Sequence, residues 1–209
     1  MLTARQNEII QRLDQLNAQS TPLKLNTDPA DLMGEYANSD ELLTDLVERY
    51  AASPSTHLVT NLAFCIHRRM FTIDPTIGTS LALRIIHLHT CKLDPGTASM
   101  IARLLDLSKV ERLTEGINQT LADLRTIALL HLDWCPGSNP PIHFWPTLDL
   151  LDNICESGLQ DRILTMDDQL YAVDQLSVAF ERNGSSLDKD DREKYRRILS
   201  AFGIQVQEF

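Results

Sequence analysis

Two pairs of histidine and cysteine residues in this sequence have the residue types and the spacing of metal ligands. His87 is followed four positions later by Cys91, and His131 is followed by Cys135 at the same spacing. Residues four apart lie on one face of a helix. If the two helices lay side by side, the four side chains could form a tetrahedral Cys2His2 zinc site.

The same pattern also has an explanation that involves no metal. Structural zinc modules usually take their cysteines from loops with tight Cys-x-x-Cys spacing, which these pairs lack. His89 and Asp133 could hydrogen-bond to the ligands, but Leu88 and Leu132 indicate an apolar helix face with polar ends. We therefore expect no cofactor, with packed thiols beside partly exposed histidines, and we keep zinc as the alternative.

Cys135 also raises the possibility of a cysteine-dependent enzyme. It stands directly before a Pro-Gly sequence, and His143 follows in the same segment. A reactive thiolate needs a nearby base and an electropositive pocket, and His143 could supply the base. No third residue that would orient the base can be placed. The chain also lacks the GxGxxG, GxxxxGK[ST], HExxH and GxSxG motifs, so we lean towards a protein that is not an enzyme.

Residues 98–108 (ASMIARLLDLS) resemble the first helix and the turn of bacterial helix-turn-helix repressors, with Ala102 where two helices approach closely. The resemblance ends there. Val110 and Leu113 come about two residues early for a recognition helix, and Arg112 stands where a buried branched residue belongs. A DNA-binding regulator is therefore the third hypothesis, and we expect no nucleic-acid partner.

Helix-start and helix-stop signals divide most of the chain into short helices. A Ser, Thr or Asp residue before an apolar periodic segment, or proline at the first helical position, predicts a start. Such signals stand at Thr3 with Gln6, Asp28-Pro29, Ser39, Ser55, Asp74-Pro75, Asp94-Pro95, Thr165 with Asp168, and Asp188. Gly203 predicts the end of the last helix, and residues 204–209 (IQVQEF) a short extended tail.

The segment 136–146 (PGSNPPIHFWP) contains four prolines and a glycine and predicts an ordered loop. Thr147 then caps a helix that ends at Gly158. The next helix, after Thr165, is expected to bury an apolar face, which consists of Met166, Leu170, Val173, Leu176 and Phe180.

The segments 80–91 and 124–135 align with each other at a spacing of 44 residues. This spacing lies within the range of HEAT and armadillo repeats, which is roughly 40–47 residues. The alignment predicts that Ile85, Leu88, Leu129 and Leu130 form the core between two equivalent helices. The expected fold is all-α, with about eight to ten helices stacked as antiparallel hairpins, either an irregular bundle or a short HEAT- or armadillo-like array. We expect one domain over residues 1–209, with a possible subdivision into 1–135 and 147–209.

Composition and charge favour a cytoplasmic protein that works with other proteins. The formal net charge is −10 with a pI of about 5.0, the opposite of the basic surface that phosphate binding needs. No secretory signal is visible at the amino terminus, and no apolar run is long enough to span a bilayer. The four cysteines show no tight framework and are expected to be reduced.

These observations favour a non-enzymatic protein-binding adaptor, a chaperone-like escort or a subunit of a larger complex. Its partners would be other proteins, and a metal-binding or cysteine-dependent enzyme at the His/Cys pairs is the alternative. Aromatic side chains in a stiff loop are candidate interface anchors, although the same rings could instead fill the core. The candidate partner-binding residues are Ile142, His143, Phe144, Trp145 and, in the tail, Phe209.

Overall fold

The computed structural model describes residues 2–18, 29–69, 71–89, 97, 100–101, 105–107, 117–135, 144–183 and 186–204. Within these residues the chain contains ten helices and no strand, which confirms the all-α prediction. The helices are α1 (Ala4–Asn17), α2 (Pro29–Tyr36), α3 (Asp40–Tyr50), α4 (Thr56–Arg68), α5 (Pro75–His89), α8 (Ile117–Trp134), α9 (Phe144–Glu156), α10 (Gln160–Ile163), α11 (Met166–Asn183) and α12 (Lys189–Ala201).

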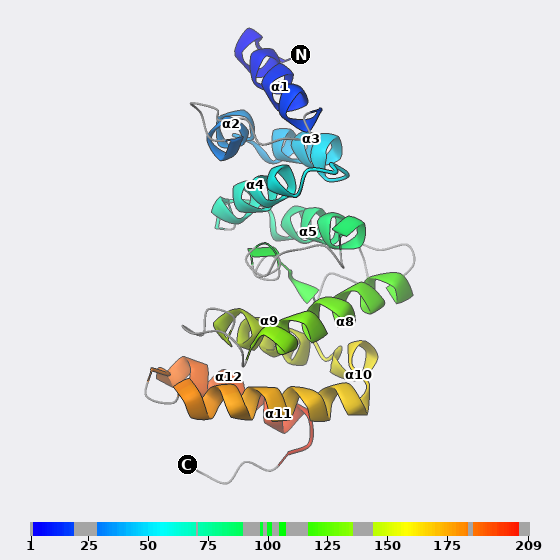
Figure 1. The fold of residues 1–209 in the computed structure, drawn as a ribbon, viewed down its shortest axis with the longest axis vertical. Helices are drawn as coiled ribbons and strands as arrows, with labels where there is room; N and C mark the ends of the chain where they lie inside the picture. Colours follow the sequence, from blue (N-terminus) through cyan, green and yellow to red (C-terminus); the bar gives the residue numbers. More distant parts are fainter. Residues whose placement is uncertain are drawn as a thin grey trace.

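The helices lie across the long axis of the molecule and are stacked in chain order (Figure 1). The amino terminus is at one end of the stack, and α11 and α12 form the layer at the other end. Most helices contact the next one along the chain, and several contact helices further on: α3 contacts α4 and α5, and α9 contacts α10, α11 and α12. Contacts between near neighbours along the chain are the pattern of stacked helical hairpins. Within the described residues, each helix is too short or too polar to cross a bilayer.

Apart from the cap predicted at Thr147, the predicted helix starts are confirmed wherever the structure describes them. Thr3 and Gln6 form a capping box, in which the Thr3 hydroxyl accepts from the Gln6 backbone N–H and the Gln6 side chain accepts from Thr3. Asp188 and Asp191 form a second box before α12. Ser39 and Ser55 cap α3 and α4, and Pro29 and Pro75 open α2 and α5. The signal at residues 94–95 lies outside the described residues.

Two predicted helix ends are also confirmed, at Gly158 and Gly203. Both glycines have a positive φ, +70° and +74°. After α12, the Ile204 N–H donates to the Leu199 carbonyl at 2.9 Å and the Gly203 N–H donates to Ser200 at 3.0 Å. This pair of bonds is the Schellman motif, which satisfies carbonyls that the helix end leaves open. Ile204 then packs against the core, and the rest of the predicted tail, 205–209, lies outside the described residues.

Two glycine-to-alanine substitutions are expected to change stability in opposite directions. Gly203→Ala forces a Cβ into a left-handed conformation and should lower the free energy of unfolding by about 1 kcal/mol. Gly34→Ala should raise it by about 0.5–1 kcal/mol, because Gly34 lies within α2 without a positive φ and an added Cβ would meet no atom within 4 Å. Urea unfolding of both variants measures the two effects. A change of the same sign in the free energy of unfolding of both variants would contradict the backbone conformations of Gly203 and Gly34.

The loop predicted over residues 136–146 is too long at its end. Helix α9 begins at Phe144, before the predicted cap at Thr147. Pro146 therefore lies in the first turn of a helix, where proline is tolerated because its missing N–H would have no partner there. Thr147 is not a cap: it is fully buried, and its hydroxyl donates to the carbonyl of His131 at 3.1 Å. Residues 136–143 lie outside the described part of the chain.

The 44-residue alignment does not correspond to equivalent positions in space. Leu88 is 42% exposed whereas Leu132 is fully buried, and Leu129 and Leu130 are only partly buried. Of the predicted core set, Ile85 alone is fully buried. The buried positions of the two helices coincide instead when the alignment is shifted by two residues, pairing Thr79, Ala82, Ile85 and Ile86 with Leu121, Leu124, Ile127 and Ala128. Sequence identity within the aligned segments therefore gave the wrong register for the buried face.

Candidate protein-binding surface

The structure describes three of the four residues of the alternative zinc site, and their environments differ. The His87 side chain is 63% exposed and its Nδ1 lies 3.1 Å from an Asp123 carboxylate oxygen, whereas His131 is fully buried. The described residues contain no group of three or more His, Cys, Asp or Glu side chains that could hold a metal ion. Cys91, the fourth predicted ligand, lies outside the described residues. His89 donates to the carbonyl of Ala51.

The described cysteines are unsuited to act as nucleophiles. Burial raises the pKa of Cys135 to about 11, and a side-chain hydrogen bond with Thr147 opposes this only in part. Burial likewise raises the pKa of Cys65 to about 11 and that of Cys155 to about 12. At neutral pH these three thiols stay protonated, and the thiolate is the reactive form. His143, the predicted base, lies outside the described residues.

The helix-turn-helix resemblance falls largely outside the described residues. Of the segment 98–108, the structure describes residues 100, 101 and 105–107. Ile101, Leu105 and Leu107 are buried, and the Asp106 N–H donates to the Thr79 hydroxyl at 2.9 Å. These few residues do not define the two helices of such a motif, and DNA binding stays the third hypothesis.

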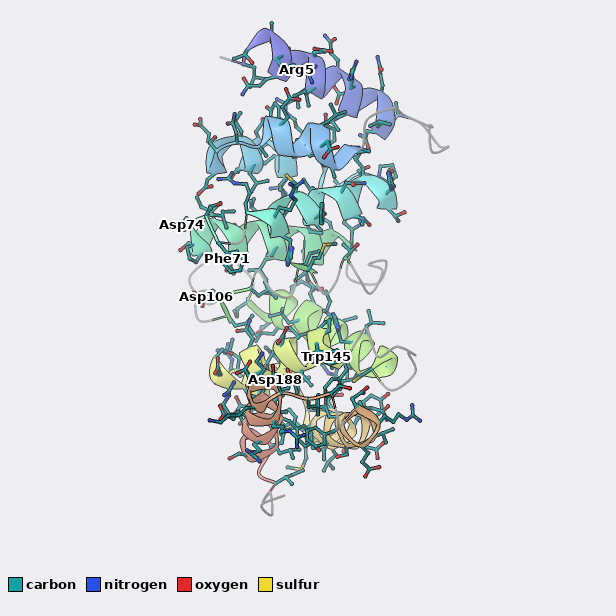
Figure 2. The ribbon with its side chains drawn as sticks, turned by 90° about the vertical axis from the view of Figure 1, so that its left-hand side faces the viewer. Arg5, Phe71, Asp74, Asp106, Trp145 and Asp188 are labelled. Carbon is teal, nitrogen blue, oxygen red and sulfur yellow. The ribbon has the colours of Figure 1, made fainter. Side chains whose placement is uncertain are left out.

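The predicted aromatic anchors connect helices within the molecule. Phe144 is fully buried, and the Trp145 ring meets it edge to face, with centroids 5.6 Å apart. The half-buried Trp145 donates from Nε1 to a carboxylate oxygen of Asp191 at 2.9 Å and so joins the first turns of α9 and α12. Figure 2 labels Trp145 and Asp188, which mark the starts of these helices. Ile142, His143 and Phe209 lie outside the described residues, so partner binding by them stays a prediction.

The sequence analysis missed a different set of exposed apolar side chains, on α11. Met166 is 78% exposed, Leu170 is 60% exposed and Tyr171 is 36% exposed. The sequence predicted Met166 and Leu170 on the buried face of this helix, and that prediction is wrong. The residues of α11 that are buried are Asp168, Ala172, Leu176, Ala179 and Asn183. The two alanines on this stripe, which allow close packing, are the sequence signal that would have given the correct face.

Several contacts hold α11 in place and thereby orient this exposed face. Arg125 of α8 donates to both carboxylate oxygens of Asp168, at 2.7 and 3.0 Å. Thr165 and Asp168 form the predicted capping box at the start of the helix. Further along, Phe180 stacks on Tyr195 of α12 with ring centroids 4.4 Å apart. The exposed side chains therefore stand on a rigid helix, which reduces the entropy that binding would lose.

Acidic groups lie beside these exposed apolar side chains. The Tyr171 hydroxyl donates to Asp133 of α8 at 2.7 Å. This hydrogen bond, together with burial and the charges of Asp133 and Asp174, raises the pKa of Tyr171 to about 12. Asp167 is exposed one turn before Tyr171, and Asp174 is exposed about one turn after it. We call the following residues the α11 surface: Met166, Leu170, Tyr171, Asp133, Asp167 and Asp174.

Within the described residues, the α11 surface combines exposed large apolar side chains with a rigid support and with nearby carboxylates. These exposed apolar side chains make it the candidate interaction surface of the described residues. The sequence matches no protein-family model, and no curated protein and no solved structure is detectably similar to it.

Proposed function

We propose that this protein is a non-enzymatic helical scaffold that binds another protein through the α11 surface, as an adaptor, a chaperone-like escort or a subunit of a larger complex. The observation that carries the proposal is the exposure of Met166 and Leu170 on a helix held by the Arg125–Asp168 pair. Side chains of this size are usually buried, and neighbouring ones exposed together mark interaction sites.

The exposed apolar side chains can supply part of the energy of association. Burying a methionine or leucine side chain contributes about 1.5–3 kcal/mol relative to leaving it exposed. Met166 and Leu170 together would thus contribute a few kcal/mol, and each 1.4 kcal/mol corresponds to a tenfold change in affinity. Tyr171 adds a residue type that is enriched among the strongest contributors to interfaces. Methionine also adapts its shape to a partner.

The two ends of the stack differ in a way that supports the same proposal. A helical stack needs terminal helices with polar outer faces to stay soluble. Helix α1 meets this need, since its exposed residues apart from Ala4 are Arg5, Asn7, Glu8, Gln11, Arg12, Asp14 and Gln15. Helix α11, in the layer at the opposite end, exposes apolar side chains instead (Figure 1). A partner on α11 would complete this end of the stack.

Site-specific photo-crosslinking in the native host tests the proposal. A photoreactive residue in place of Asp174, at the edge of the α11 surface, should give a discrete adduct whose protein partner mass spectrometry identifies. The same residue in place of Gln11 on α1 is the matched control. The adduct should disappear when Met166→Ser and Leu170→Ser are added, because these remove the apolar contact. An adduct that survives both substitutions, or that forms equally at Gln11, would reject the proposal.

A further inference from the structure

The charge around the α11 surface restricts what its partner can be. Helix α11 carries four acidic residues, Asp167, Asp168, Asp174 and Glu181, and one basic residue, Arg182. Of the acids, Asp168 is compensated by Arg125. The α8 acid Asp133 faces the same surface through its hydrogen bond to Tyr171. The apolar side chains are therefore bordered by carboxylates on two helices, within a chain whose net charge is −10.

We propose that the segment that docks on the α11 surface is a basic amphipathic helix, with one apolar stripe and with Lys or Arg residues beside it. This inference rests on the proposed function and specifies the chemistry of the partner. Complementary charges at the border of an apolar contact steer association and set its register. A helix that lays an apolar face on such a surface is a common mode of recognition between proteins.

The dimensions of the surface suit a short helical segment. The stretch from Met166 to Asp174 extends over roughly 12 Å, because a helix rises about 1.5 Å per residue. Roughly two turns of a partner helix cover that length, and two turns present apolar residues at positions i, i+4 and i+7. Basic side chains beside this stripe reach the carboxylates of Asp133, Asp167 and Asp174 along their flexible stems.

The same charges oppose two other occupants. A second copy of this chain, docked symmetrically on the α11 surface, would place two acidic surfaces against each other. Like charges placed together at an interface disfavour that pairing. An anionic lipid surface would meet the same carboxylates and be repelled. The apolar side chains alone would fit either occupant, so it is the acidic border that selects a basic partner.

Designed peptides test this inference without knowledge of the natural partner. The probe is an amidated helical peptide of about 18 residues with a leucine stripe and lysine on both flanks. One matched peptide has glutamate in place of each lysine, and another has the lysine composition in scrambled order. Titration calorimetry measures the affinity of each for the full chain, at low salt and at roughly 0.3 M salt, where charges are strongly screened.

The lysine peptide is expected to bind, and the glutamate and scrambled peptides to bind at least about tenfold more weakly. The double variant Met166→Ser with Leu170→Ser should weaken binding about tenfold or more at both salt concentrations. The double variant Asp167→Asn with Asp174→Asn should weaken it roughly fivefold at low salt and much less at high salt. Circular dichroism verifies that each variant keeps its helices.

Matched controls separate docking on the α11 surface from general attraction to an acidic protein. Glu41→Gln with Glu48→Gln removes the same charge from exposed positions of α3, and Phe71→Ser removes a side chain that is 90% exposed elsewhere. Neither should change the affinity. Equal losses in the control variants, or equal binding of the glutamate peptide, would overturn the inference. If no peptide binds while the crosslink at Asp174 still depends on Met166 and Leu170, the basic helix is wrong and the proposed function stands.

Discussion

Leu132→Ala is expected to lower the free energy of unfolding by about 2–5 kcal/mol, whereas Leu88→Ala should lower it by less than about 1 kcal/mol. The two leucines occupy aligned positions in the segments 124–135 and 80–91, yet Leu132 is fully buried and Leu88 is 42% exposed. Truncating a buried leucine removes its burial energy and leaves a cavity, and an exposed one has little of either to lose.

Urea unfolding of the two variants at one temperature gives this comparison directly, because both substitutions remove the same atoms. Equal losses would restore the 44-residue equivalence and would contradict the register of α5 and α8. Leu129→Ala provides an intermediate reference, since Leu129 is partly buried and packs against the edge of the core. Its loss should lie between those of the other two variants.

Asp168→Ala is expected to lower the free energy of unfolding by about 2–3 kcal/mol at neutral pH. The substitution removes the bidentate pair with Arg125 and the capping box with Thr165. Loss of a cap costs about 1 kcal/mol, and breaking a buried ion pair costs more, although the 45% exposure of the Arg125 side chain reduces that part. Asp167→Ala, on the adjacent exposed residue, should cost less than about 0.5 kcal/mol.

The Asp168 contribution should also depend on pH in a defined window. The Arg125 hydrogen bonds, aided by those from Thr165, lower the pKa of Asp168 from 3.8 to about 2. A carboxylate whose pKa is lower in the folded state stabilises the fold above its unfolded pKa and loses this contribution as the pH falls. The difference in the free energy of unfolding between wild type and Asp168→Ala should therefore decrease as the pH falls from about 4 to about 2. A difference that stays constant over this range would show that Asp168 acts through packing alone.

The sequence was most informative where structure is decided locally. Capping at Thr3, Ser39, Thr165 and Asp188 depends on residues within one turn, so their positions in the sequence predicted the helix starts. Gly203 likewise marked the end of α12, because few other residues tolerate a left-handed conformation. The helical class of the fold followed from these signals together with the apolar periodicity.

Features that depend on tertiary packing could not be predicted in this way. The buried faces of α5 and α8 are set by the helices that pack against them. Identical residue types at aligned positions of 87–91 and 131–135 therefore do not lie in equivalent environments. The start of α9 at Phe144 was missed because Pro146 was assigned to the preceding loop. Proline is tolerated in the first turn of a helix, so it did not exclude a helix there.

On α11 the candidate site was missed for a related reason. The sequence offered two apolar stripes, and hydrophobicity favoured the one with Met166 and Leu170. The other stripe is buried because Ala172 and Ala179 let neighbouring helices approach and because Asp168 has its partner in Arg125. Close packing of small side chains thus determined which face of the helix is exposed.

The stacking of each helix on its near neighbours also has a consequence for how the molecule opens. Contacts between residues close in sequence form without closing long loops, so such a chain is expected to fold rapidly. Opening can start at a terminal layer and leave the remaining layers packed, because the most extensive contacts among the described helices join near neighbours in the stack. Helices α11 and α12 form such a layer. A partner bound on α11 would therefore protect the amide hydrogens of this end from exchange, and that protection would fade layer by layer towards α1.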